Sequence, residues 1–176
     1  MAEPSPQENN IQENNIQEND FAYQQIIHLL NSKNINYKLT THKPTKTSQE
    51  SAEVRGATIA SGAKAMLIKE SKNQIFCLLV MSAAKKLSWK LAKQIINSKK
   101  CGMASEIDVY EITKCLPGAV PPFGSIFKIQ TYMDNSLIQQ GDIINFNCGL
   151  RTKSIQMQIQ DYLKVENPKI CDFTEE

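Results

Sequence analysis

The sequence predicts an α+β fold, with a mixed, largely antiparallel sheet and flanking helices. Helical patterns alternate with short apolar runs along most of the chain. Two of these runs, over 63–69 and 75–81, are separated by Glu-Ser-Lys-Asn, which favours a β-hairpin. With 176 residues, the chain is long enough for one domain of ordinary size with its own core.

The first 20 residues differ from the rest and predict a disordered, low-complexity tail. Residues 7–20 repeat a Gln-Glu-Asn-Asn-Ile unit, whose period of five matches neither a helix nor a strand. A role in tethering or in docking a partner is the alternative for this tail. The folded domain is expected over 21–170, and residues 171–176 are expected to form a C-terminal tail.

The charge of the chain is distributed unevenly. Residues 1–20 hold five acids and no Lys or Arg, so the remaining residues carry 20 basic and 13 acidic groups. The resulting net charge of +7 favours a polyanionic partner, with nucleic acid first.

Periodicity and capping residues predict the elements of the first half. An amphipathic helical pattern begins at Phe21, Ser48 precedes a second helical segment, and Gly56 ends it. In order, the expected elements are a helix over 21–34, a strand over 36–41, a helix over 49–55, and the hairpin strands over 63–69 and 75–81.

The second half continues the alternation of helices and strands. Ser88 and Ser105 are the expected N-caps of two further helices, the first with an apolar face that ends at Ile96. The other expected elements are a strand near 101–104, the second helix over 106–114, strands near 125–130, 142–147 and 152–156, and a last helix over 159–164.

Cysteine and histidine usage argues against a metal centre. Five scattered cysteines form no C-x-x-C pair, and two histidines complete no ligand set of recognisable spacing, so we expect no metal and no cofactor. Reduced thiols indicate a cytoplasmic protein. The acidic, Asn-rich N-terminus does not have the pattern of a signal peptide, and no apolar run is long enough to cross a membrane.

The segment 115–124 is the strongest candidate for a binding loop. Three prolines and two glycines exclude a helix or a central strand, yet Leu116, Val120 and Phe123 make the segment apolar. A stiff apolar loop with exposed amides suits the wall of a small-molecule pocket. A purely structural turn is the alternative.

Lys64 is the first candidate for chemistry, because it begins a mostly apolar strand after Gly62. Its side chain either extends to solvent or points into a cleft, where it could anchor a phosphate or polarise an ester carbonyl. Arg55, beside Gly56, is interpreted as a charge that favours the C-terminus of its helix.

The turn after the strand near 142–147 offers further polar groups. Asn147 and the Gly149 amide form a possible donor pair for a substrate carbonyl. Cys148 with His42 as its base would make a thiol nucleophile, although a structural cysteine is favoured because no orienting third group is evident. His42 itself is either a base, a pocket wall or a structural histidine.

Residues 85–100 contain six lysines and no acid. Such a segment is either a solvated helix face or a seat for RNA phosphates, where each neutralised phosphate releases counterions.

Several segments of the chain, taken in their order along the sequence, resemble the YbaK / prolyl-tRNA synthetase-associated domain family of aminoacyl-tRNA deacylases. The resemblance spans roughly 21–165. The segments that carry it are Thr-His-Lys-Pro at 41–44, Thr-Ser-Gln-Glu-Ser-Ala-Glu-Val-Arg-Gly at 47–56, Gly-Ala-Lys-Ala-Met-Leu-Ile-Lys at 62–69, Lys-Leu-Ser-Trp-Lys-Leu-Ala-Lys at 86–93, Gly-Ala-Val-Pro-Pro-Phe-Gly at 118–124 and Phe-Asn-Cys-Gly-Leu-Arg-Thr at 146–152.

The resemblance implies a free-standing editing enzyme that hydrolyses the ester between a wrongly attached small amino acid and the 3′-terminal adenosine of a tRNA. The functional lysine of the family falls on Lys64, and no metal is required. The substrate-binding residues are expected to be Gly118, Ala119, Val120, Pro121, Phe123, Gly124, Asn147, Gly149, Thr47 and His42. The tRNA-binding residues are expected to be Lys85, Lys86, Lys90, Lys93 and Arg151.

Two departures from the family pattern leave the amino acid open. No histidine follows His42, whereas the relatives that clear alanine have one in the C-terminal strand region, and Lys46 stands where many relatives have a bulkier residue. The expected partners are the acceptor end of an aminoacyl-tRNA and an aminoacyl-tRNA synthetase, with no membrane, and the oligomeric state stays open. A non-catalytic tRNA-binding or synthetase-associated module and a hydrolase that uses Cys148 are the alternatives.

Overall fold

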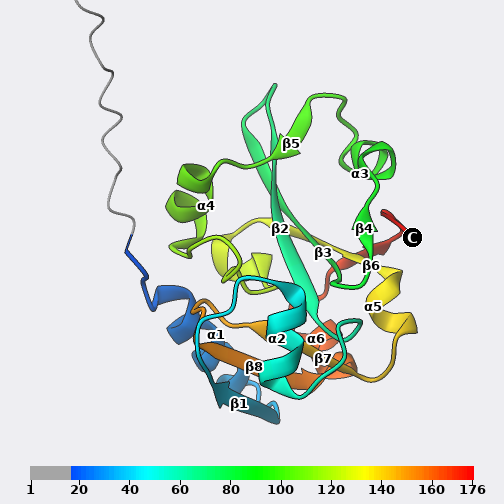
Figure 1. Cartoon of the computed structure of the whole chain (residues 1–176). Helices are drawn as coiled ribbons and strands as arrows, with labels where there is room; N and C mark the ends of the chain where they lie inside the picture. The colour runs from blue at the N-terminus through cyan, green and yellow to red at the C-terminus, as the bar shows by residue number, and fades with distance from the viewer. Residues whose placement is uncertain (1–16) are drawn as a thin grey trace, which may run out of the picture.

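A computed structural model describes residues 17–176 of the chain. The predicted disordered tail therefore lies outside the described residues, except for 17–20, which lead into the first helix. The larger of two main sheets has the strand order β5-β2-β3-β6-β9 (Figure 1). Its strands are β5 (Cys101–Met103), β2 (Ala63–Glu70), β3 (Ile75–Ser82), β6 (Gln130–Asp134) and β9 (Lys169–Cys171).

The smaller sheet has the order β1-β8-β7 and is antiparallel throughout. Its strands are β1 (Tyr37–Thr41), β8 (Lys153–Gln158) and β7 (Ile143–Asn147). In the larger sheet, β2 runs antiparallel to β3 and β5, whereas β3–β6 and β6–β9 are parallel pairs. The predicted α+β class with a mixed, largely antiparallel arrangement is thus confirmed.

The larger sheet is buried on both faces, which explains why β3 reads as a continuous apolar run. Leu67, Leu78 and Val80 face the main core, together with the apolar sides of α1 (Phe21–Ser32) and α6 (Ile159–Glu166). The opposite face carries Ile68 and Leu79 and is covered by α3 (Trp89–Ile96).

Capping residues define the helix starts largely as predicted. Ser88 and Ser105 accept hydrogen bonds from the first turns of α3 and α4 (Glu106–Thr113). The cap of α2 (Ser48–Arg55) lies one residue before the expected Ser48, because Thr47 forms a capping box with Glu50. Gly56 ends α2 with φ +62°, a left-handed conformation that suits glycine.

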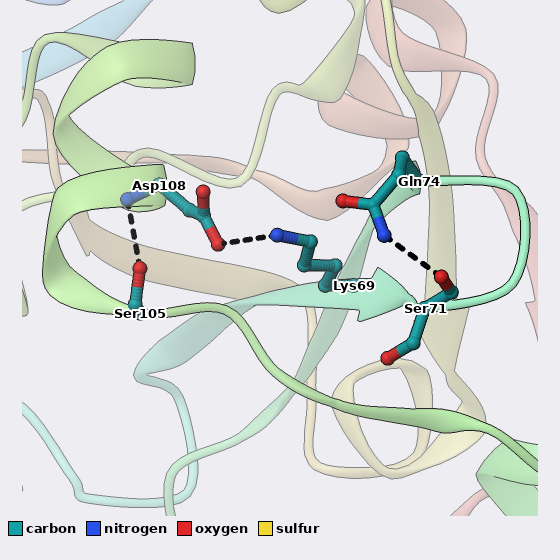
Figure 2. Close-up of polar contacts among 5 residues, drawn as sticks. All are labelled: Lys69, Ser71, Gln74, Ser105 and Asp108. Carbon is teal, nitrogen blue, oxygen red and sulfur yellow. Dashed lines mark hydrogen bonds and ion pairs between the residues drawn. The ribbon is translucent and has the colours of Figure 1, made fainter.

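Polar contacts fix the connection between β5 and α4 against the sheet (Figure 2). Lys69 Nζ lies 3.1 Å from Asp108 Oδ2, and the Asp108 amide donates to Ser105 Oγ at 3.0 Å. The hydrogen bond from Lys69 lowers the pKa of Asp108. In the turn between β2 and β3, Gln74 Nε2 donates to the carbonyl oxygen of Ser71. The ion pair between Lys69 and Asp108 holds the start of α4 close to β2.

The prediction of a strand over 125–130 is wrong. Residues Gly124–Phe127 form a 3₁₀ helix, and β6 begins only at Gln130. The Glu166 carboxylate accepts from both the amide and the hydroxyl of Ser125, and Lys128 is left-handed with φ +59°. Local backbone bonds, from the Lys128 amide to Ser125 and from the Ile129 amide to Gly124, replace the ladder that a strand would need.

Residues 171–176, expected as a tail, belong to the folded structure. β10 (Thr174–Glu175) pairs with β4 (Lys86–Leu87), and Phe173 between β9 and β10 is fully buried against the α3 side of the sheet. The carboxylate of Asp134, at the start of α5 (Asn135–Gln139), accepts from the Phe173 amide and the Thr174 hydroxyl. Sequence reasoning missed β4, α5, β9 and β10 because all of them are very short.

Phe173→Ala should lower the free energy of unfolding by about 3–5 kcal/mol, because it leaves a cavity in the core under α3. The matched control is Ile170→Ala in the neighbouring strand, where the side chain is 45% exposed and the loss should stay below about 1 kcal/mol. Urea denaturation of both variants measures the difference. Equal losses would contradict the anchoring role of Phe173.

Candidate functional site

A cleft of about 780 Å³ lies between α2, the first half of β2 and the loop that follows α4. The predicted catalytic lysine and five of the residues predicted for substrate or tRNA contact line it, from five separate segments of the chain. These residues are Thr47, Lys64, Gly118, Val120, Asn147 and Arg151.

One face of α2 forms a wall of this cleft. Ser48, Ser51, Ala52 and Arg55 line it, and their spacing places them on a single side of the helix. This side carries no bulky apolar residue, so it leaves space where an ordinary amphipathic helix would fill a core. The pattern was visible in the sequence and could have indicated the site.

Arg55 lines the cleft, although the sequence indicated only a charge at the end of its helix. Its Nη2 donates to Asn147 Oδ1 at 2.9 Å, and its Nε donates to Ser154 Oγ at 2.9 Å. Among residues 17–176 it forms no ion pair. Burial lowers the pKa of Arg55 to about 10, so the guanidinium remains charged at neutral pH.

Asn147 connects this arginine to the proline-rich loop. While its side-chain oxygen accepts from Arg55, its Nδ2 donates to the carbonyl oxygen of Gly118 at 2.8 Å. Arg151 donates to the neighbouring carbonyl of Pro117 at 2.9 Å. Gly118 has φ +84°, a left-handed conformation that glycine adopts without strain. The loop is therefore held in one shape by side chains from β7 and from the turn after it.

The loop itself divides into a wall and an anchor. Pro117, Gly118 and Val120 line the cleft. Ala119, Pro121, Phe123 and Gly124 are buried, and the Phe123 ring packs edge-on against Phe146 and Tyr162. The segment is thus both the pocket wall and the structural turn that the sequence left as alternatives.

Two predicted donors already have partners. The Gly149 amide donates to the carbonyl oxygen of Ala119 at 2.9 Å, and a side chain at Gly149 would collide with the backbone of Tyr23. Since Asn147 Nδ2 is bonded to Gly118, the expected donor pair for a substrate carbonyl does not form.

His42 lies beneath the cleft wall, outside the residues that line it. Its Nδ1 is 2.8 Å from the carbonyl oxygen of Lys43, and its Nε2 is 2.7 Å from Ser154 Oγ. A carbonyl oxygen only accepts, so Nδ1 carries the proton in this contact. The Ser154 hydroxyl in turn donates to Asn147 Oδ1 at 3.2 Å. His42 therefore positions the serine that receives the hydrogen bond from Arg55.

Cys148 has the surroundings of a structural thiol. It is fully buried, its Sγ contacts the carbonyl oxygen of Lys153, and burial raises its pKa to about 12. The hypothesis of a Cys148 nucleophile activated by His42 does not fit this geometry, because His42 is bonded to Ser154 instead.

The cleft is cationic. Lys46, Arg55, Lys64 and Arg151 line it, and none of its lining residues within the described range is Asp or Glu. Lys64 is exposed and shares a face of β2 with Met66, which also lines the cleft. Such a cavity suits an anionic ligand such as a phosphodiester.

The remaining predicted tRNA contacts lie outside the cleft. Lys85 and Lys86 follow Ala83, a lining residue, and Lys90 and Lys93 belong to α3 (Figure 1). Within residues 17–176, no group of three or more His, Cys, Asp or Glu could hold a metal ion. No helix in this part of the chain is long and apolar enough to cross a membrane.

Comparison with known proteins identifies relatives of this arrangement. A family model described as the aminoacyl-tRNA editing domain matches residues 42–165. The chain is 29% identical to the multifunctional Ser/Thr-tRNA deacylase ProXp-y of Escherichia coli (strain K12), over 86% of this chain and 92% of that protein. It is 27% identical to the prolyl-tRNA editing protein ProX of Acetoanaerobium sticklandii, over 66% of this chain and 74% of that protein.

A solved structure supports the fold assignment. A crystal structure described as a candidate trans-editing enzyme for prolyl tRNA synthetase superposes with a TM-score of 0.77, at 19% identity. The superposition covers 88% of this chain and 98% of the other.

Alkylation of the native protein should spare Cys148 while it labels Cys101, which is partly exposed. Because a pKa of about 12 keeps the Cys148 thiol protonated, raising the pH from 7 to 9 should not increase its labelling. Mass spectrometry after brief iodoacetamide treatment locates the labels, and unfolded protein serves as the control. Labelling of Cys148 before Cys101 would contradict its buried placement.

Proposed function

The chain belongs to the aminoacyl-tRNA editing domain family, and we propose that its cleft hydrolyses the ester of mischarged aminoacyl-tRNAs that carry a small amino acid. The observation that carries the proposal is Lys64 in the wall of a cationic cleft, together with the Gly118 loop and Asn147. The cleft accepts the acceptor end of the tRNA, whose phosphates meet Lys46, Arg55 and Arg151.

The chemistry needs little from the protein beyond position and charge. Water attacks the ester carbonyl carbon and loses a proton, and negative charge develops on the carbonyl oxygen. The ester C–O bond then breaks, the tRNA hydroxyl takes up a proton, and hydrolysis yields the free amino acid. A cation near the carbonyl oxygen stabilises the charged intermediate, which is the role proposed for Lys64.

Hydroxyl side chains on the α2 side support serine or threonine as the amino acid removed. Thr45, Ser48, Ser51 and Thr58 all line the cleft. A relative at 29% identity is named as a Ser/Thr-tRNA deacylase. A wall that hydrogen-bonds a substrate hydroxyl discriminates strongly against substrates without one, whereas an apolar pocket separates them weakly.

A path for the tRNA leads out of the cleft past Ala83. The lysines at 85, 86, 90 and 93 begin two residues beyond that lining residue and continue along α3. We propose that they contact the acceptor stem and that the protein acts in the cytoplasm, free or docked on a synthetase. Their contribution is electrostatic and independent of sequence.

A non-catalytic module with the same fold is the alternative. It would bind charged and uncharged tRNA equally and hydrolyse no aminoacyl ester. The cavity favours the enzyme, because a module that only bound the tRNA surface would not need a cleft lined by Lys64.

Lys64→Ala should reduce kcat/KM for deacylation of a non-cognate tRNA charged with serine by about 100-fold. The reason is that the negative charge on the carbonyl oxygen loses its stabilising cation. Lys72→Ala is the matched control, since Lys72 is an exposed lysine in the turn after β2 and does not line the cleft. Release of radiolabelled serine measures both rates. Equal rates for wild type and Lys64→Ala would refute the proposed role of Lys64.

Neutralising Lys90 and Lys93 to Gln should weaken tRNA binding and reduce the slope of log Kd against log salt by about 1–2. The double variant of Lys38 and Lys164, exposed lysines outside α3, provides the control. Fluorescence anisotropy with uncharged tRNA at several salt concentrations measures the slopes. A slope identical to that of the control would place the tRNA elsewhere on the surface.

A further inference from the structure

We infer that the free edge of β2 at Ala65 binds the main-chain atoms of the aminoacyl group, as a neighbouring strand would. This inference rests on the proposed function and names which part of the substrate the edge recognises. The recognising groups are the backbone amide and carbonyl of a residue with no functional side chain.

The hydrogen-bond pattern of β2 shows which way Ala65 faces. The Leu67 carbonyl accepts from the Ala104 amide, on the β5 side, at 3.0 Å. The Gly62 carbonyl accepts from the Ala83 amide, on the β3 side, at 2.8 Å. Because backbone groups alternate along an antiparallel strand, the amide and carbonyl of Ala65 point to the same side as those of Leu67.

On that side, β5 no longer covers the strand. Its register with β2 begins at Ile68, opposite Met103, and extends only toward Glu70. Figure 1 shows β2 continuing past β5 toward α2. On the same side, β7 pairs with β2 through a bridge between Asn145 and Gly62, three residues before Ala65. In the described part of the chain, neither group of Ala65 joins this bridge, the ladder with β5, or a loop or side-chain hydrogen bond. Ala65 therefore presents one donor and one acceptor at an open sheet edge.

This edge is a wall of the cleft. All five consecutive residues from Gly62 to Met66 line the same cavity. Alternate side chains of a strand point to opposite faces, so a cavity that touches five in succession lies along the backbone edge. Ala65 is partly exposed, and Lys64 lies next to it along the strand.

An aminoacyl ester carries the partner for this edge. Its α-nitrogen, α-carbon and carbonyl are arranged as in a strand residue, so it can form a one-residue antiparallel bridge. The ammonium donates to the Ala65 carbonyl, and the Ala65 amide donates to the ester carbonyl oxygen. The second bond strengthens as negative charge develops on that oxygen.

Such a bridge contacts only the α-ammonium and the ester carbonyl, which are common to aminoacyl esters whatever their side chain. It aligns the ester carbonyl beside Lys64 whichever side chain is attached, while the opposite wall selects the side chain. The bridge should therefore favour substrates with a free α-ammonium over α-hydroxyacyl esters.

Ala65→Pro tests the amide directly, because proline lacks the N–H, and an unpaired edge position tolerates proline. Ala65→Val is the matched control, since valine is similar in size to proline and keeps the backbone N–H. For Ser-tRNA, Ala65→Pro should lower kcat by about 100-fold relative to Ala65→Val. Equal kcat values would overturn the inference while an active wild type left the proposed function intact. A wild type without turnover would overturn both.

An NMR titration decides the matter if Ala65→Pro fails to fold. Adding the non-hydrolysable amide of serine and 3′-amino-3′-deoxyadenosine to ¹⁵N-labelled wild type should shift the Ala65 amide more than that of Leu67, which faces β5. Replacing the α-ammonium of this analogue by a hydroxyl should weaken its binding at least about tenfold, the loss expected for a charge-assisted hydrogen bond. Saturation without a shift at Ala65 would overturn the inference.

Discussion

The partly buried guanidinium of Arg55 is the constraint on which the cleft depends. It joins α2 to residues 92 and 99 positions further along the chain, Asn147 and Ser154. Through Asn147 the same contact reaches the carbonyl of Gly118, and through Ser154 it reaches His42. A cation in this position is costly to bury unless its donors are satisfied, so the contacts specify a single arrangement of the surrounding segments.

Around this constraint, the site combines a rigid frame with an accessible interior. Phe123, Phe146 and Tyr162 fix the far end of the proline-rich loop in the core, while its near end borders the cleft. The charged groups of the interior are positive, and the strand edge adds neutral main-chain groups. In the proposed function, charge attracts the acceptor end, whereas the uncharged edge and the hydroxyl-bearing helix bind the amino acid. This division would let one small domain bind a large polyanion and select a small side chain.

The sequence predicted the parts of this picture that depend on local patterns. Hydrophobic periodicity and caps such as Ser88 and Ser105 gave the helices, and the segment matches gave Lys64 and the Gly118 loop. Arg55 does lie in the last turn of its helix, as predicted, but its contacts with Asn147 and Ser154 were not predicted because these partners are distant in sequence. Gly149 was predicted as a donor to the substrate. Its amide instead donates to Ala119, a contact that depends on tertiary packing and leaves no pattern in the sequence. Phe173 was assigned to a tail because strands of two or three residues carry no detectable period.

Removal of small amino acids from tRNA is the activity that separates an editing cleft from a passive binding site. It is measured as the deacylation rate of the wild-type protein on a panel of tRNAs charged with serine, threonine, alanine, proline and isoleucine, each against spontaneous hydrolysis in buffer. The protein should accelerate deacylation with serine or threonine and leave isoleucine at the spontaneous rate. Rates equal to spontaneous hydrolysis across the whole panel would rule out editing by this cleft.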